Sequence, residues 1–229
     1  MAEENQNEKK GKIIVIKKKL LIAIVLIVAA LITAFLLLRP TGKMIADDSP
    51  VLGNGVVNVV EFSDYECQFC QASEGTNQQV ISSLKQTDPN WEAPIPKIIE
   101  EYVNTGKVKL IFRQYPVHLN KYPALAAKCA QEQNKFWEYH KNLFENYDSL
   151  TVTDLKKYAV DLNLNVNQFN DCLESRKYEE SIQNDSNDGQ GLGITGTPTF
   201  FIGSEEKGYE KIEGAESFST FKQIIESKL

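Results

Sequence analysis

Two cysteines three positions apart, Cys67 and Cys70, are the residues of this chain best suited to chemistry. They follow an apolar stretch, residues 55–62, that predicts a strand, and they stand where a helix is expected to begin. The partial positive charge at a helix N-terminus favours a thiolate over a thiol. With two residues between them, the sulfurs can close a small disulfide ring or open to a dithiol. The pair therefore predicts reversible redox chemistry, although half of a zinc site has the same spacing.

A zinc site would require this pair to converge with Cys129 and Cys172, the remaining cysteines. A strong four-cysteine signature has two closely spaced pairs, whereas this sequence has one. The two histidines, His118 and His140, show no matching ligand spacing, and we expect structural roles for them. Neither a metal nor a cofactor is expected.

Composition sets the size of the fold and its class of partner. The chain has 229 residues, 42% of them hydrophobic and 24% charged, which suits one buried core with or without an inserted lobe. Its net charge of −6 is unevenly spread: residues 1–38 hold six lysines and three glutamates, so the remainder carries −9. An acidic body of this kind argues against nucleic acid as a partner.

A membrane anchor is predicted near the N-terminus. Residues 20–38 form a stretch of 19 uncharged residues, and a helix of that length spans the ~30 Å hydrocarbon core of a bilayer. Three lysines at positions 17–19 precede it, so the positive-inside rule keeps the tail, residues 1–19, in the cytoplasm. Residues 39–50 then read as a short polar tether. We expect a single-pass signal anchor at the cell membrane with an extracytoplasmic domain.

A cleaved signal peptide is the alternative to this anchor. The apolar run is longer than the usual ~7–15 residues of a signal-peptide core, and no well-placed small-x-small site follows it. Ala46 is a weak candidate farther along the chain. We expect the anchor to stay uncleaved, and a mature N-terminus near Asp47 would contradict this.

Residues 51–229 alternate predicted strands and helices. Apolar patterns predict strands at 55–62, 107–115, 199–202 and around 210–213. From 123 to about 182 the apolar period is helical, and a last amphipathic helix closes the chain. A β-α-β unit, a helical insertion, a hairpin and a final helix follow one another in the order of a thioredoxin-like fold with an inserted α-helical lobe.

Three segments carry a resemblance to a known family. They are Glu-Phe-Ser-Asp-Tyr-Glu-Cys-Gln-Phe-Cys at 61–70, Lys-Phe-Trp-Glu at 135–138 and Gly-Thr-Pro-Thr-Phe-Phe at 196–201. In this order the chain resembles the DsbA-like thiol-disulfide oxidoreductases over roughly residues 50–229. The resemblance implies an α/β thioredoxin-like domain at 51–229 with a helical insertion at about 120–188.

The resemblance also assigns roles to individual residues. Cys67 would be the nucleophile that forms mixed disulfides, and Cys70 the resolving thiol. Thr197 and Pro198 stand where related folds have a cis-proline beside the redox-active disulfide, and their backbone would pair with an extended substrate peptide.

Glu61 stands six residues before Cys67, where similar proteins hold a buried acid beneath the second cysteine. Burial would raise the pKa of this carboxyl group and let it relay the proton of Cys70. For a glutamate in general, a strand-edge carboxylate in water is the commoner state. The resemblance favours the relay.

Two departures from the family pattern bear on the direction of electron flow. DsbA has a histidine before its second cysteine that helps to hold the thiolate, and this chain has Phe69 there. Many relatives have proline after the first cysteine, where this chain has Gln68. The expectation of net oxidation therefore rests on compartment and family, and a redox titration against glutathione tests it.

Cys129 and Cys172 fall on apolar faces of predicted helices in the insertion. A free cysteine in such a place is often a small buried hydrophobe. In an exported domain, however, an even number of cysteines favours pairing, and some DsbA-like proteins have a second, structural disulfide. We expect these two residues to form one.

Two classes of function follow. The first is a membrane-anchored extracytoplasmic oxidoreductase that forms, or reduces or isomerises, disulfides in exported cysteine-containing proteins and is reset by a membrane disulfide oxidase or reductase. The second is a tethered peptide-binding or chaperone-like module on the same fold, without redox turnover. A Cys67→Ser variant separates them, because catalysed oxidation would vanish while simple binding would survive.

Overall fold

The computed structural model describes residues 26–27 and 43–229, and Gly42–Leu229 form one compact unit. Its strands are β1 (Val51–Leu52), β2 (Val57–Ser63), β3 (Val108–Gln114), β4 (Thr199–Ser204) and β5 (Gly208–Glu213). The helices before the insertion are α2 (Gln68–Ser73), α3 (Gln78–Thr87), α4 (Pro94–Ile98) and the π-helix η1 (Ile99–Val103). The later ones are α5 (Tyr122–Gln131), α6 (Phe136–Glu145), α7 (Val152–Asp161), α8 (Val166–Glu174), α9 (Glu179–Gly191) and α10 (Phe218–Lys228).

The strands of the described residues form a mixed sheet in the order β1-β3-β2-β4-β5. β2 pairs in parallel with β3 and antiparallel with β4, which places it at the centre. Its apolar side chains are buried on both faces, since Val59 packs on one side and Phe62 on the other. The near-continuous apolar run of β2 is therefore explained by helices that cover both faces.

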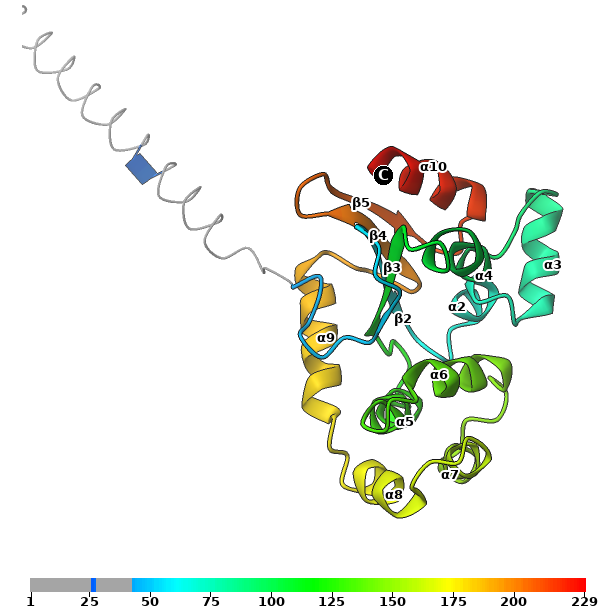
Figure 1. Cartoon of the computed structure of the whole chain (residues 1–229), viewed down its shortest axis with the longest axis vertical. Helices are drawn as coiled ribbons and strands as arrows, with labels where there is room; N and C mark the ends of the chain where they lie inside the picture. The colour runs from blue at the N-terminus through cyan, green and yellow to red at the C-terminus, as the bar shows by residue number, and fades with distance from the viewer. Residues whose placement is uncertain (1–25, 28–42) are drawn as a thin grey trace, which may run out of the picture. The chain divides into compact units, whose positions relative to one another are not determined.

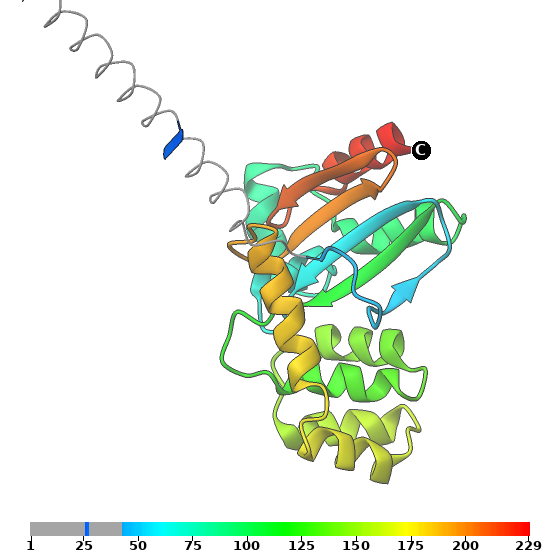
Figure 2. The same ribbon diagram turned by 90° about the vertical axis from the view of Figure 1, so that its left-hand side faces the viewer.

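Two helical layers cover the sheet (Figure 1). On one face, α4, η1 and α10 pack on the strands around Ile98, Phe200 and Phe221. On the other face lies α9, which Figure 2 shows running across the sheet. Phe62, Tyr115 and Ile194 form the small core on that side. This arrangement confirms the predicted thioredoxin-like α/β architecture.

The predicted helical lobe is also present. Helices α5 to α8 form a layered group beside the sheet (Figure 2). Their buried core includes Leu125, Tyr139, Leu155 and Phe169 and continues to Phe112 of β3. The helical apolar period marks these buried faces in the sequence. After α8, the chain leaves the lobe and returns to the sheet through α9, which precedes β4.

The segment 43–50 differs from the expected tether, because it packs on the domain. The guanidinium of Arg113, fully buried on β3, donates to the carbonyl oxygens of Lys43 and Met44 at 2.6 and 2.8 Å. The ammonium of Lys128 donates to the Asp48 carboxylate at 2.6 Å. Two buried cations thus find acceptors in this segment, which gives it a fixed place.

The predicted anchor at 20–38 lies outside the described residues except for Leu26 and Ile27. Among the described residues, the helices are all too short or too polar to cross a bilayer.

Candidate active site

Cys67 and Cys70 lie at the start of α2, just after the short loop that connects β2 to this helix. Cys67 is the N-cap residue of that helix, with extended backbone angles, and Cys70 lies within the first turn. Cys67 is 8% exposed, whereas Cys70 has no exposed surface. Both are free thiols, and only the first can meet a protein substrate without a rearrangement.

The environment of Cys67 favours the thiolate. A hydrogen bond from Cys70, helped by Thr197 and by the backbone amides of Cys70 and Phe69, lowers the pKa of Cys67 to about 6 against the opposing effect of burial. Cys70 and the two amides belong to the first turn of α2, where the helix dipole has the same sign of effect. Cys67 is therefore suited to act as nucleophile and as leaving group.

Cys70 is held in the opposite state. Burial, followed by the hydrogen bond and the negative charge of Cys67, raises the pKa of Cys70 well above its ordinary value. A thiol of this kind is a poor nucleophile until a base removes its proton. The two thiols thus differ in the way that a nucleophile and a resolving cysteine must differ.

The pKa of Cys67 makes alkylation a direct test. Below neutral pH a thiolate with a pKa of about 6 remains reactive, and at pH 7 roughly nine tenths of it is ionised. We expect the rate of carboxamidomethylation of native reduced protein to rise with a midpoint near pH 6, with Cys70 unmodified. A Cys70→Ser variant, which replaces the thiol that donates the hydrogen bond, should change that midpoint. A midpoint near the ordinary ~8.5 would contradict this account.

The Thr197–Pro198 segment lies against the nucleophile. The peptide bond between them is cis, and the Thr197 carbonyl oxygen is 3.3 Å from the Cys67 sulfur. Pro198 immediately precedes β4, and its carbonyl oxygen accepts a hydrogen bond from the Gly214 amide at 2.8 Å. The structure thus brings together two motifs that lie 130 residues apart in the sequence.

Glu61 lies inside the protein, on β2 between Phe112 of β3 and Phe200 of β4. Glu61 is only 1% exposed, and neither of its carboxylate oxygens has a hydrogen-bond partner among the described residues. Burial raises its pKa well above the ordinary value, and the charges of Glu74 and Cys67 add to this effect. The alternative of a carboxylate in water is therefore wrong.

Sequence reasoning missed a hydrogen-bonded group beside this acid. Glu74, which ends α2, accepts from or donates to Nε2 of His140 at 3.1 Å, and the Tyr65 hydroxyl lies 3.2 Å from Nδ1 of the same ring. His140 was expected to be structural, and aromatic rings of α6 do surround it. The available signal was the position of Glu74 four residues after Cys70, one helical turn farther on.

The other histidine, His118, anchors a loop near the nucleophile. Its Nδ1 lies 2.7 Å from Oδ2 of Asp64, which also accepts from the amides of Val117 and His118. The hydrogen bond to Asp64 raises the pKa of His118. Asp64, Glu66 and His118 place three potential ligand atoms within 4.8 Å of one another, and the bonds to Asp64 assign it to holding this loop.

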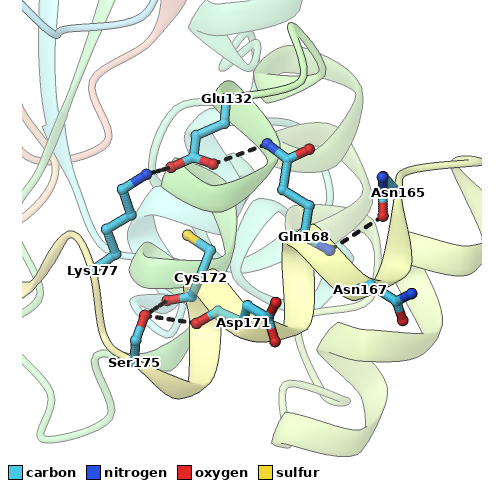
Figure 3. A pocket seen from close by; sticks show the side chains of 8 residues that line it. All are labelled: Glu132, Asn165, Asn167, Gln168, Asp171, Cys172, Ser175 and Lys177. Carbon is cyan, nitrogen blue, oxygen red and sulfur yellow. Dashed lines mark hydrogen bonds and ion pairs between the residues drawn. The ribbon is translucent and has the colours of Figure 1, made fainter.

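Cys129 of α5 and Cys172 of α8 are joined by a disulfide, with their Cα atoms 5.8 Å apart. Both residues are buried in the core of the lobe. Beside Cys172, a polar surface hollow is lined by side chains of the lobe that bond one another (Figure 3). Glu132 accepts there from Lys177 and Gln168. Because the Cys172 sulfur is held in the disulfide, this hollow offers no free thiol, unlike the Cys67 site.

A family model described as "Thioredoxin" matches residues 89–227, more than half of the chain. The chain belongs to the thioredoxin family. The matched segment of this thioredoxin-family protein includes the lobe and the Thr197–Pro198 turn, and it begins after the CxxC motif.

Two kinds of curated protein are among the relatives of this thioredoxin-family chain. It is 30% identical over 150 residues to Na(+)/H(+) antiporter NhaA 3 of Salinispora tropica, an alignment that covers 64% of this chain and 20% of the relative. The chain thus spans about a fifth of the length of the antiporter relatives. It is 27% identical over 169 residues to "Probable disulfide bond formation protein D" of Bacillus cereus, covering 68% of this chain and 67% of the relative.

Solved structures agree on the fold. BdbD from Bacillus subtilis superposes with a TM-score of 0.67 at 23% identity, over 83% of this chain and 97% of that one. Alpha-DsbA1 from Wolbachia pipientis gives a TM-score of 0.65 at 25% identity, over 81% and 92%. The resemblance of this thioredoxin-family chain to the DsbA-like thiol-disulfide oxidoreductases is confirmed.

Proposed function

We propose that this protein is a membrane-anchored, extracytoplasmic thiol-disulfide oxidoreductase that forms disulfides in exported proteins through Cys67 and Cys70. The observation that carries the proposal is the unequal pair of thiols beside Thr197–Pro198: the pKa of Cys67 is lowered to about 6 and that of Cys70 is raised. The name of the Bacillus cereus relative, "Probable disulfide bond formation protein D", supports the same reaction.

The reaction balances as a two-electron exchange. A substrate thiolate attacks the Cys67 sulfur of the oxidised protein, the bond between Cys67 and Cys70 breaks, and the Cys70 sulfur leaves and takes a proton from Glu61. A second substrate thiolate then attacks the substrate sulfur of the mixed disulfide and displaces the Cys67 thiolate. The substrate gains a disulfide, and the protein becomes a dithiol.

The state of Cys67 supports oxidation of the substrate as the net direction. Groups that stabilise the thiolate of the reduced protein make its disulfide a stronger oxidant. Donors from the start of α2 supply this stabilisation here, although Phe69 replaces the histidine of DsbA. The substrate peptide would lie in extended form along the backbone of Thr197, which borders the Cys67 sulfur.

The predicted anchor at 20–38, with lysines before it, supports an extracytoplasmic position for the domain. A membrane disulfide oxidase, as the redox partner, would then accept the two electrons and restore the disulfide between Cys67 and Cys70. Exported cysteine-containing proteins would be the substrates. The antiporter relatives match this chain over one part of their length only, and their activity is not part of the proposal.

The test is a redox assay with the oxidised protein. Added to a reduced, unfolded test protein in glutathione buffer, it should accelerate disulfide formation, and its own reduction potential should lie nearer the ~−120 mV of DsbA than the ~−270 mV of thioredoxin. A potential near that of thioredoxin would favour a reductase and overturn the proposed direction.

A further inference from the structure

A polar hollow of about 490 Å³ adjoins the redox-active motif. Its lining includes Glu66 and Gln68, the two residues on either side of Cys67 in the chain. The rest of the lining comes from α2 and α3, which lie side by side in Figure 1, and from the loops after β3 and α6. These residues are Gln71, Asn77, Gln79, His118, Tyr147 and Asp148. We call this hollow the flanking pocket.

The floor of the flanking pocket consists of two buried amide side chains, Gln71 and Asn77. The Gln71 side chain donates to the carbonyl oxygen of Tyr65 at 3.0 Å and accepts from the Asn77 side chain at 2.9 Å. The Asn77 oxygen accepts from the Val80 amide and so caps α3. Because these amide groups are bonded within the protein, the floor has a fixed shape and leaves recognition to the walls.

The walls present polar groups to water. Gln68, Gln79 and Asp148 are exposed, and Glu66 is half-buried. One oxygen of the Glu66 carboxylate accepts from the Asn120 side chain at 3.2 Å, which orients this group without neutralising its charge. The walls therefore offer carboxylate and amide oxygens as acceptors for a ligand.

The charge of the flanking pocket is negative. Glu66 and Asp148 each contribute a carboxylate, and the lining residues include neither lysine nor arginine. The basic group among them is His118, whose Nδ1 lies 2.7 Å from Oδ2 of the buried Asp64 carboxylate. A protonated His118 is thus balanced by Asp64, which leaves the charges of the two wall carboxylates uncompensated within the lining. A cleft lined by charge of one sign attracts groups of the opposite sign.

The nucleophile brings a ligand to this pocket. A substrate cysteine joined to Cys67 lies next to Glu66 and Gln68, and an extended peptide advances only ~3.3–3.6 Å per residue. A smaller hollow that shares Gln68 with the flanking pocket continues along the motif to Phe69. Side chains within about three residues of the substrate cysteine therefore come within reach of the walls, whereas more distant ones do not.

If the proposed function holds, we propose that the flanking pocket selects exported substrates that have a lysine or arginine within about three residues of the reacting cysteine. The cationic group pairs with the carboxylates of Glu66 and Asp148, and the side-chain oxygen of Gln68 accepts one of its N–H groups. The redox step is unchanged: the substrate dithiol becomes a disulfide, and the disulfide of the protein becomes a dithiol.

Three short dithiol peptides test this with the oxidised full-length protein in neutral detergent. The peptides are identical except for the residue beside each cysteine, which is lysine, alanine or glutamate. Their oxidation rates are measured at low ionic strength, and each is divided by the rate of the same peptide with hydroxyethyl disulfide. This division removes the effect of the neighbouring charge on the peptide thiol itself. We expect the corrected rate of the lysine peptide to exceed that of the glutamate peptide by about tenfold or more.

Variants locate the preference. Glu66→Gln/Asp148→Asn, which keeps an oxygen at both positions, should bring the ratio of the lysine and glutamate rates to within about twofold of one. Asp148→Lys should reverse the preference. The matched control, Glu205→Gln/Glu206→Gln, removes two carboxylates from the exposed turn after β4, at the end of that strand away from Pro198, and should leave the ratio unchanged.

The ratio is insensitive to a general change in the reactivity of Cys67, because both peptides react with the same sulfur. Added salt should shrink the ratio, since it screens charges near the surface. EDTA should leave the ratio unchanged, and a preference that EDTA removes would show that the pocket holds a metal ion instead. Equal corrected rates in wild type, or a preference that persists in Glu66→Gln/Asp148→Asn, would also overturn the inference.

The same measurements distinguish this inference from the proposed function. If the oxidised wild type oxidises none of the three peptides, the proposed function fails. If it oxidises all three at equal corrected rates, the proposed function stands and the flanking pocket takes no part in the choice of substrate.

Discussion

Replacement of Cys67 by serine is expected to abolish catalysed disulfide formation in a reduced test protein. Cys67 is the thiol that is both partly exposed and ionised near neutral pH, since its pKa is about 6. A serine hydroxyl at this position cannot form a mixed disulfide. Removal of a covalent nucleophile costs several orders of magnitude in rate in other enzymes, and we expect activity at the uncatalysed background.

Cys70→Ser is the matched control for this prediction. It keeps the attacking thiol and removes the resolving one, so mixed disulfides with the test protein should accumulate and be visible on a non-reducing gel. If wild type and Cys67→Ser oxidise the test protein equally slowly while both bind it, the cysteines are incidental. That result would favour the tethered peptide-binding module.

Loss of the disulfide between Cys129 and Cys172 is expected to have the largest effect on stability. The bond links α5 to α8 across 43 residues of chain. For a loop of that length, the chain-entropy estimate of the stabilisation is about 4 kcal/mol. The double variant Cys129→Ser/Cys172→Ser should lower the free energy of unfolding in urea by roughly that amount, a large part of the usual ~5–15 kcal/mol.

The redox site supplies the control in this experiment. Cys67 lies at the start of α2, and the groups that lower its pKa come from α2 and the Thr197 turn rather than from α5 or α8. The folded double variant should therefore keep an alkylation midpoint near pH 6. Unfolding curves that coincide with those of wild type would show that the bond contributes nothing to stability.

The sequence was sufficient for the features that have strong local signals. Three features could be predicted from a few neighbouring residues each. They are the apolar run of β2, the glycine that ends the helical segment before β3, and the cysteine pair at the start of α2. The approach of Thr197–Pro198 to Cys67 followed from the family resemblance, because nothing local reports a contact across 130 residues.

The features that escaped prediction depend on tertiary contacts. β1 has two residues, Val51 and Leu52, and exists because β3 offers a free edge for antiparallel pairing. The hydrogen bond between Glu74 and His140 joins α2 to the lobe. It could not be predicted, because neither residue lies in a sequence pattern that indicates a partner on another helix. Arg113 likewise has no local sequence feature that indicates burial, whereas the fold buries it completely.

The contacts of residues 43–50 decide where a soluble version of this protein can begin. A recombinant chain cut at residue 51 would lose Asp48, whose carbonyl and carboxylate oxygens are both acceptors for the buried Lys128 ammonium. It would also lose the carbonyl acceptors of Arg113. Lys128 would then have no hydrogen-bond acceptor among the described residues, which is strongly destabilising for a buried cation, whereas Arg113 would keep its ion pairs with Asp185 and Asp188. A recombinant chain without residues 20–38 should therefore begin at or before residue 43, so that residues 43–50 still cover Arg113 and Lys128 and accept their hydrogen bonds.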